Sequence, residues 1–201
     1  MRIYLVRHGS TIWNEKMLWQ GRKNVPLSEK GKKEIRLLAL RFASVPVDKI
    51  YSSPLSRAVE TAKEIAKVHG LNVEILEDLI EADFSRWEGK KGSYIKENDP
   101  AYEIWSSDPD ATIDGIEPVK MVHERAKRAL DFIMKNGGEE IVVVSHAMLM
   151  RMIICEILKM DLRAFRNFLL FNASVTTIVE DSLGLRLEVL NDTSHLGGVN
   201  L

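Results

Sequence analysis

An arginine, a histidine and a glycine follow the first apolar run of the chain. Residues 3–6 are Ile, Tyr, Leu and Val, which is typical of a short buried strand, and Arg7, His8 and Gly9 come directly after it. In an open α/β sheet, ligands bind at the carboxyl ends of the strands. A guanidinium offers forked donors to phosphate oxygens, an imidazole can attack or protonate, and a glycine lets an anion approach the backbone. These residues favour phosphate chemistry, although alone they would equally fit a surface ion pair and an ordinary loop histidine.

Similar residues follow two other expected strands. Residues 49–52, Lys-Ile-Tyr-Ser, are expected to form a second strand, and Pro54 behind it suits the first turn of a helix that would carry Arg57. Residues 140–144 form the clearest strand, apolar enough for the centre of a parallel sheet, and lead to His146. Parallel strands bring their carboxyl ends to one edge, so we expect two arginines and two histidines to meet there. The N-termini of the following helices would add N–H groups and dipoles that favour an anion.

The elements that position these residues alternate between strand and helix patterns. Ser28 is typical of a helix N-cap, and the helix behind it runs to about Phe42. We expect further helices over residues 54–70, from about 117 to 137, and after His146, with strands over 73–76, 174–179 and 185–190. The pattern predicts an α/β fold, a three-layer sandwich with a mostly parallel sheet, helices on both faces and an antiparallel edge strand.

The chain is expected to form a single domain over residues 1–201. Residues 77–118 interrupt the pattern with glycines, prolines and aromatic residues, and we interpret them as an irregular insertion with short helices that shapes the substrate pocket. Within this stretch Trp105, like Trp13 and Trp19 earlier in the chain, is interpreted as a packing residue.

Composition excludes several classes of partner. The 201 residues contain 28 Lys and Arg against 29 Asp and Glu, a net charge of -1, which argues against nonspecific binding to nucleic acid or to an anionic membrane. The sequence shows no signal-peptide pattern and no apolar stretch long enough to span a bilayer, so we expect a cytoplasmic protein. The single cysteine, Cys155, lies in an apolar run and is expected to be buried rather than catalytic.

The histidines give no metal-binding pattern. None of the five lies in an HExxH motif or a close pair, so we expect no metal and no cofactor. His69 and His123 fit helix surfaces. His195 fits either a residue that helps to close the site or a structural contact near the end of the chain.

Five blocks of residues form a pattern that extends over nearly the whole chain. They are Leu5 to Thr11 with Trp13-Asn14; Gln20-Gly21 and Pro26-Leu27-Ser28 with Gly31; Tyr51 to Leu55 with Arg57-Ala58 and Thr61-Ala62; Glu81 with Phe84 and Trp87-Glu88-Gly89; and Val144-Ser145-His146. With these blocks the chain resembles the histidine phosphatase superfamily, the group of the cofactor-dependent phosphoglycerate mutases. In that order they match the family's opening signature, the loop and helix start, the second block, the acid segment and the second histidine. The departures are Ser10, where the family often has an acid, Asn24 in place of Asp, and Ala147 in place of a glycine.

The resemblance implies a role for each matching residue. His8 would be the nucleophile that forms a phosphohistidine, and Glu81 would protonate the leaving alkoxide and then activate water. Arg7, Arg57 and His146 would hold the phosphoryl oxygens without a metal. Further phosphate-binding groups are expected at Asn14, Gln20, Gly21 and Ala147.

The resemblance implies a phosphomonoesterase that acts on a small-molecule phosphate ester. The α-ribazole phosphatases and the broad-specificity phosphatases are similar to an equal degree. Two alternatives stay open: a phosphoglycerate mutase, and a catalytically silent phospho-ligand binder, which the presence of His8 and Glu81 disfavours. The sequence names neither the substrate nor the oligomeric state, so a homo-oligomer stays open.

Overall fold

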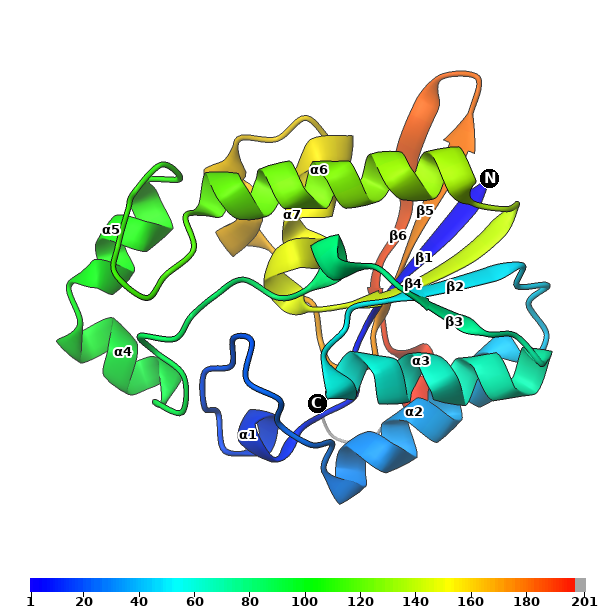
Figure 1. Cartoon of the computed structure of the whole chain (residues 1–201), viewed down its shortest axis with the longest axis horizontal. Coiled ribbons are helices and arrows are strands. Elements are labelled where there is room, and N and C mark those ends of the chain that lie inside the picture. The colour runs from blue at the N-terminus through cyan, green and yellow to red at the C-terminus, as the bar shows by residue number, and fades with distance from the viewer. Residues whose placement is uncertain (198–201) are drawn as a thin grey trace.

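A six-stranded sheet with the order β3-β2-β4-β1-β5-β6 forms the centre of the computed structural model, which describes residues 1–197 (Figure 1). Its parallel part consists of β1 (Arg2–Arg7), β2 (Lys49–Ser52), β3 (Val73–Ile75) and β4 (Glu140–Ser145). On the other side of β1, β5 (Val175–Asp181) and β6 (Gly184–Asp192) form an antiparallel hairpin. The predicted α/β class and mostly parallel sheet are confirmed, with an antiparallel edge of two strands.

The register of the central strands places their carboxyl ends side by side. Arg7 at the end of β1 lies opposite Ser145 at the end of β4, and Ser52 at the end of β2 lies opposite Val144. Strand β4 lies between β1 and β2, and its four aliphatic residues, 141–144, are fully buried, as expected for a strand covered on both faces. The loops that follow β1, β2 and β4 therefore begin at one edge.

Helices cover both faces of the sheet. Helices α2 (Glu29–Phe42) and α3 (Ser56–His69) pack on one face, and α6 (Val119–Asn136) and α7 (Ala147–Ile157) on the other (Figure 1). Each pair contributes to its own apolar cluster: Leu38 and Ile65 belong to one, and Leu130 and Ile153 to the other. This is the predicted three-layer arrangement.

Local signals explain the start of α2 and the end of α3. The Ser28 hydroxyl accepts from the Gly31 N–H and so caps α2, and Gly70 adopts a left-handed φ of 64° that ends α3. The expectation for Pro54 was wrong in detail, because α3 begins at Ser56 with Leu55 at the N-cap and Pro54 lies in the turn before it. Arg57 nevertheless falls in the first helical turn.

The segment between β3 and α6 extends beyond the carboxyl edge of the sheet (Figure 1). It contains a 3₁₀ turn, η1 (Glu77–Leu79), and the short helices α4 (Gly92–Asn98) and α5 (Ala101–Ser107). The short elements α1 (Ile12–Glu15), η2 (Leu162–Asn167) and η3 (Ser194–Leu196) were not predicted. Within residues 1–197, no helix has the length and apolarity needed to cross a membrane.

Candidate active site

A cavity of about 390 Å³ opens at the carboxyl edge of the parallel strands. Seven of the nine residues singled out in the sequence line it: Arg7, His8, Asn14, Gln20, Arg57, Glu81 and Ala147. The other two lie just behind the wall. The His146 ring is buried with its centroid 5.1 Å from that of His8, and the Gly21 carbonyl accepts from Arg57.

The hydrogen bonds of His8 define its tautomer. Nδ1 lies 2.8 Å from the Gly9 carbonyl oxygen, and Nε2 lies 3.3 Å from Nε of Arg57. A carbonyl only accepts and a guanidinium only donates, so the proton is on Nδ1 and the lone pair is on Nε2. Burial, reinforced by the charges of Arg57 and Arg7, holds the pKa of His8 well below its usual value. The ring is therefore neutral at pH 7.

The Arg57 guanidinium is anchored at all three nitrogens. Besides His8, it donates to the carbonyls of Gly21 at 2.8 Å and Lys23 at 2.9 Å. Gly21 cannot be replaced freely, because a Cβ there would lie 2.8 Å from the Phe84 backbone nitrogen. Burial lowers the pKa of Arg57 to about 10, so the charge persists at neutral pH.

Arg7 and His146 each keep a buried nitrogen without a hydrogen-bond partner in this region. Arg7 donates from one terminal nitrogen to the Leu170 carbonyl at 2.6 Å, while its buried Nε has no partner among the described residues. Nε2 of His146 lies 2.7 Å from the Ser53 hydroxyl, and its buried Nδ1 is likewise unpartnered within residues 1–197. Burial, followed by the charge of Arg57, holds the pKa of His146 well below normal. Nε of Arg7, which lines the cavity, can donate to an anion that enters it.

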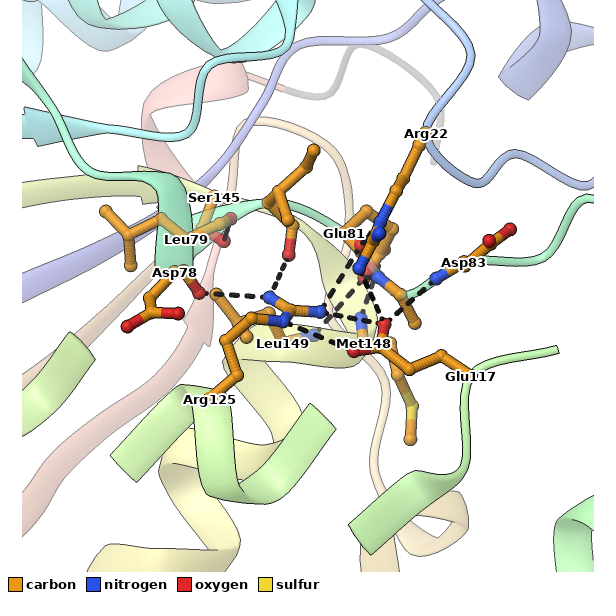
Figure 2. Close-up of polar contacts among 12 residues, drawn as sticks. Arg22, Asp78, Leu79, Glu81, Asp83, Glu117, Arg125, Ser145, Met148 and Leu149 are labelled. Atoms are coloured by element: carbon orange, nitrogen blue, oxygen red, sulfur yellow. Dashed lines mark hydrogen bonds and ion pairs between the residues drawn. The ribbon is translucent and has the colours of Figure 1, made fainter. Parts of the chain in front are cut away.

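The Glu81 carboxylate lies at the N-terminus of α7. Oε1 accepts from the Ala82 N–H at 2.9 Å and the Leu149 N–H at 3.3 Å, and Oε2 accepts from the Met148 N–H at 3.3 Å (Figure 2). These bonds fix the direction in which the carboxylate faces the cavity.

Two guanidiniums clamp the backbone around Glu81. Arg22 and Arg125 both donate to its carbonyl, at 3.2 and 3.4 Å, and both pair with the Glu117 carboxylate at 3.0 Å (Figure 2). Arg125, which is buried, also donates to the carbonyls of Asp78 and Ile80. Sequence reasoning missed this network, because the partners are distant along the chain.

Asn14 and Gln20 use their side-chain oxygens to hold the loop after β1. Oδ1 of Asn14 accepts from the Thr11 N–H at 3.0 Å and from Nδ2 of Asn172 at 3.2 Å, and Oε1 of Gln20 accepts from the Thr11 hydroxyl at 3.0 Å. The amide NH₂ groups of both residues are then the donors left for a ligand.

Comparison with known proteins identifies the family. The family model described as histidine phosphatase superfamily (branch 1) matches residues 3–193. The chain belongs to this superfamily. It is 36% identical to phosphoserine phosphatase 1 of Hydrogenobacter thermophilus over 98% of this chain and 95% of the relative. The resemblance inferred from the sequence is confirmed.

Solved histidine phosphatase structures share the fold. A phosphoserine phosphatase mutant of Entamoeba histolytica in complex with phosphoserine superposes with a TM-score of 0.87 at 28% identity, covering 97% of this chain and 98% of that one. The α-ribazole phosphatase of Shigella flexneri gives a TM-score of 0.84 at 26% identity, covering 96% of each chain. Probable phosphoglycerate mutases also match, at 29% identity or lower. The prediction of a phosphatase of this family is confirmed, and a mutase has less support.

Several cavity residues of this histidine phosphatase were missed or misassigned from the sequence. Trp19 and Trp105 do pack in an aromatic cluster, as expected, but they also line the cavity. Tyr102, Phe165, Arg151 and Arg166 line it too. No sequence signal marked the aromatic residues, whereas Arg151 left one that was overlooked: a charge with apolar residues on both sides in α7.

The remaining candidates lie outside the cavity. Arg41 on α2 donates to Nδ1 of His195 at 3.2 Å, which is a structural contact near the end of the chain. His123 pairs with Glu156 at 2.9 Å. Cys155 is buried, and burial raises the pKa of its thiol to about 11. Within residues 1–197, no three His, Cys, Asp or Glu side chains gather as a metal-binding group.

Proposed function

We propose that the protein hydrolyses small phosphate monoesters through a phosphohistidine formed at Nε2 of His8. One observation carries the proposal: Nδ1 is committed to the Gly9 carbonyl, which leaves the lone pair of Nε2 beside the Arg57 guanidinium inside the cavity. A neutral imidazole next to a fixed cation suits attack on a phosphoryl group, because the cation stabilises the oxygens that the attack brings close.

In the first step, the Nε2 lone pair forms a bond to phosphorus and the bond from phosphorus to the ester oxygen breaks. Arg7, Arg57 and Nδ1 of His146 donate to the phosphoryl oxygens, and the NH₂ groups of Asn14 and Gln20 add neutral donors. Gly21 acts through its carbonyl, which anchors Arg57. The backbone N–H of Ala147, at the start of α7, completes the set. Preorganised cations of this kind supply the stabilisation that metal ions give in other phosphoryl-transfer enzymes.

Glu81 handles the protons in both steps. Its protonated carboxyl gives a proton to the leaving alkoxide, and the resulting carboxylate then takes one from the water that attacks the phosphohistidine. That attack releases phosphate and regenerates neutral His8. The amides of Met148 and Leu149 hold the carboxyl group in the orientation that both transfers require.

The acceptor in this proposal is water, which makes the enzyme a phosphatase rather than a mutase. We retain the cytoplasm as the predicted compartment, since the lone thiol of Cys155 needs no oxidising environment. A small phosphate ester, rather than a nucleic acid, is the proposed ligand, because the cavity has a volume of only about 390 Å³ and the net charge is -1. A homo-oligomer is a further proposal, which the molar mass of the protein in solution tests.

The test is a panel of phosphate esters assayed for released phosphate, with and without a chelator. We expect release that the chelator does not alter, and no conversion of 3-phosphoglycerate to its 2-isomer. Release that a chelator abolishes and Mg²⁺ or Zn²⁺ restores would contradict the proposal. Rapid isomer conversion would instead favour the mutase.

A further inference from the structure

The cavity is lined by a half-buried arginine that the proposed reaction does not use. Arg151 on α7 lines the cavity, and its buried Nε has no hydrogen-bond partner among the described residues. Nor is an ion pair found for it within residues 1–197. A buried N–H without an acceptor is costly, so this Nε is most readily explained by a ligand that supplies the missing acceptor.

The helix places Arg151 one turn away from the phosphate-binding end of the cavity. Ala147 and Arg151 are four residues apart on α7 and both line the cavity, so their backbones are separated by about 6 Å along the helix axis. Long side chains on a helix lean towards its N-terminus, which directs this guanidinium back towards the reacting groups. The charge of Arg151 also acts on Arg7. Burial lowers the pKa of Arg7, the Glu81 carboxylate raises it, and the positive charge of Arg151 lowers it.

The charges of the cavity indicate what Arg151 would bind. Arg7 and Arg57 together match the two negative charges of a phosphate monoester, and Glu81 must be protonated at the start of the reaction. Besides the exposed Arg166, Arg151 then remains as an uncompensated cation that lines the cavity. Tyr102, Trp105 and Phe165, which line the same cavity, carry no negative charge that could neutralise it at neutral pH. A planar guanidinium pairs best with a carboxylate, through two parallel hydrogen bonds.

We propose that Arg151 binds a carboxylate of the substrate, so that the enzyme prefers short phosphorylated acids in which a carboxylate lies a few bonds from the phosphoester. This inference rests on the proposed function only in taking the same cavity as the phosphate site. Arg151 is then a specificity-determining residue and takes no part in the attack of His8.

The test compares matched substrates that differ only in the carboxylate. O-Phosphoserine is paired with O-phosphoethanolamine, and 3-phosphoglycerate with glycerol 3-phosphate. We expect wild type to favour the carboxylated member by about 10- to 100-fold in kcat/KM, as a charge-assisted pair would give. In Arg151→Met this preference should disappear, while p-nitrophenyl phosphate hydrolysis and inhibition by inorganic phosphate stay within about 3-fold of wild type. Arg186→Met, a change at an exposed ion pair on β6, is the matched control.

The outcomes separate this inference from the proposed function. If wild type hydrolyses p-nitrophenyl phosphate but treats both pairs alike, or if Arg151→Met keeps the preference, the inference is wrong. A third pair, propane-1,3-diol bisphosphate and propyl phosphate, tests for a second phosphate in place of the carboxylate. If wild type prefers the bisphosphate by a larger factor than it prefers the carboxylated esters, the inference is also wrong.

If no ester is hydrolysed, the proposed function fails, and the inference is tested by measuring binding affinities with calorimetry. The His8→Ala variant should then bind O-phosphoserine more tightly than O-phosphoethanolamine. Equal affinities would overturn the inference. So would a difference that persists when Arg151→Met is added to His8→Ala.

Discussion

Nε of Arg57 donates to Nε2 of His8 at 3.3 Å, so the one lone pair of the His8 ring is held against a fixed cation. The two residues are 49 positions apart and come from the loop after β1 and the first turn of α3. They meet because β1 and β2 both flank β4, which brings the loops that follow them to one edge.

The first prediction concerns the shape of the Arg57 side chain. Arg57→Lys should lower kcat by about 100-fold or more, although the charge is kept, because one ammonium cannot reach His8, Gly21 and Lys23 together and also donate to phosphate. Steady-state kinetics with p-nitrophenyl phosphate checks this, and circular dichroism shows whether the fold persists. Unchanged kinetics in a folded variant would remove Arg57 from the site.

The second prediction concerns the protonation of the two buried histidines. Their pKa values lie well below 6.5, so ¹⁵N-detected spectra should show His8 and His146 still neutral at pH 6, with the His8 proton on Nδ1. As the pH falls below about 6.5, the unfolded chain takes up protons that these rings in the native state do not. The free energy of unfolding should therefore fall with decreasing pH, by up to about 1.4 kcal/mol per pH unit for each ring.

Replacing His8 provides the control for that effect. His8→Gln should unfold with a shallower pH dependence than wild type over the same range. Rings that titrate near 6.5 in the folded protein would contradict the burial and charge effects described for this site.

The third prediction tests Arg125 as a residue that positions Glu81. Arg125→Lys keeps a cation but loses the hydrogen bonds from the guanidinium to the carbonyls of residues 78, 80 and 81. The Glu81 carboxyl group should therefore shift. We expect kcat to fall by about 10- to 100-fold for alkyl phosphates, which need a proton on the leaving oxygen, and far less for p-nitrophenyl phosphate, which does not. Equal losses for both substrates would indicate a general structural effect and contradict this role.

Most of the fold followed from patterns that depend on local physics. The apolar run of β4 and the caps at Ser28 and Gly70 are local, and so are the helical periods of α2 and α3. Arg7, His8, Arg57 and His146 could be grouped in advance because each follows a strand that the alternation of elements makes parallel. Grouping these four residues requires only the order and direction of the strands, and no knowledge of side-chain packing.

The rest of the cavity could not be predicted, because it depends on packing between distant segments. Trp19 and Trp105 line the cavity only because the loop after β1 packs against α5. The clamp on Glu81 joins Arg22, Glu117 and Arg125, none of which belongs to a readable motif. Arg151 did leave a signal, a charge among apolar residues, but α7 was interpreted as a core helix alone.

The fourth prediction concerns the second step of the reaction. In Glu81→Gln, His8 should still attack p-nitrophenyl phosphate, but hydrolysis of the phosphoenzyme should slow because no carboxylate activates water. A burst of nitrophenol followed by slow turnover is expected in stopped-flow measurements. Glu124→Gln, at an exposed glutamate on α6, should behave as wild type. A Glu81→Gln enzyme without a burst but with normal turnover would exclude Glu81 from this step.

The most direct test of the account is to find where the phosphate is bound during turnover. Glu81→Gln mixed with p-nitrophenyl phosphate and quenched without acid should carry one phosphate on His8, labile to acid and stable to base. Peptide mass spectrometry locates the residue, and ³¹P spectra distinguish the two ring nitrogens. The account predicts phosphate on Nε2 of His8 and none in a Glu81→Gln enzyme that also carries His8→Ala. Phosphate on Ser10, Ser145 or Cys155, or on Nδ1 of His8, would contradict it.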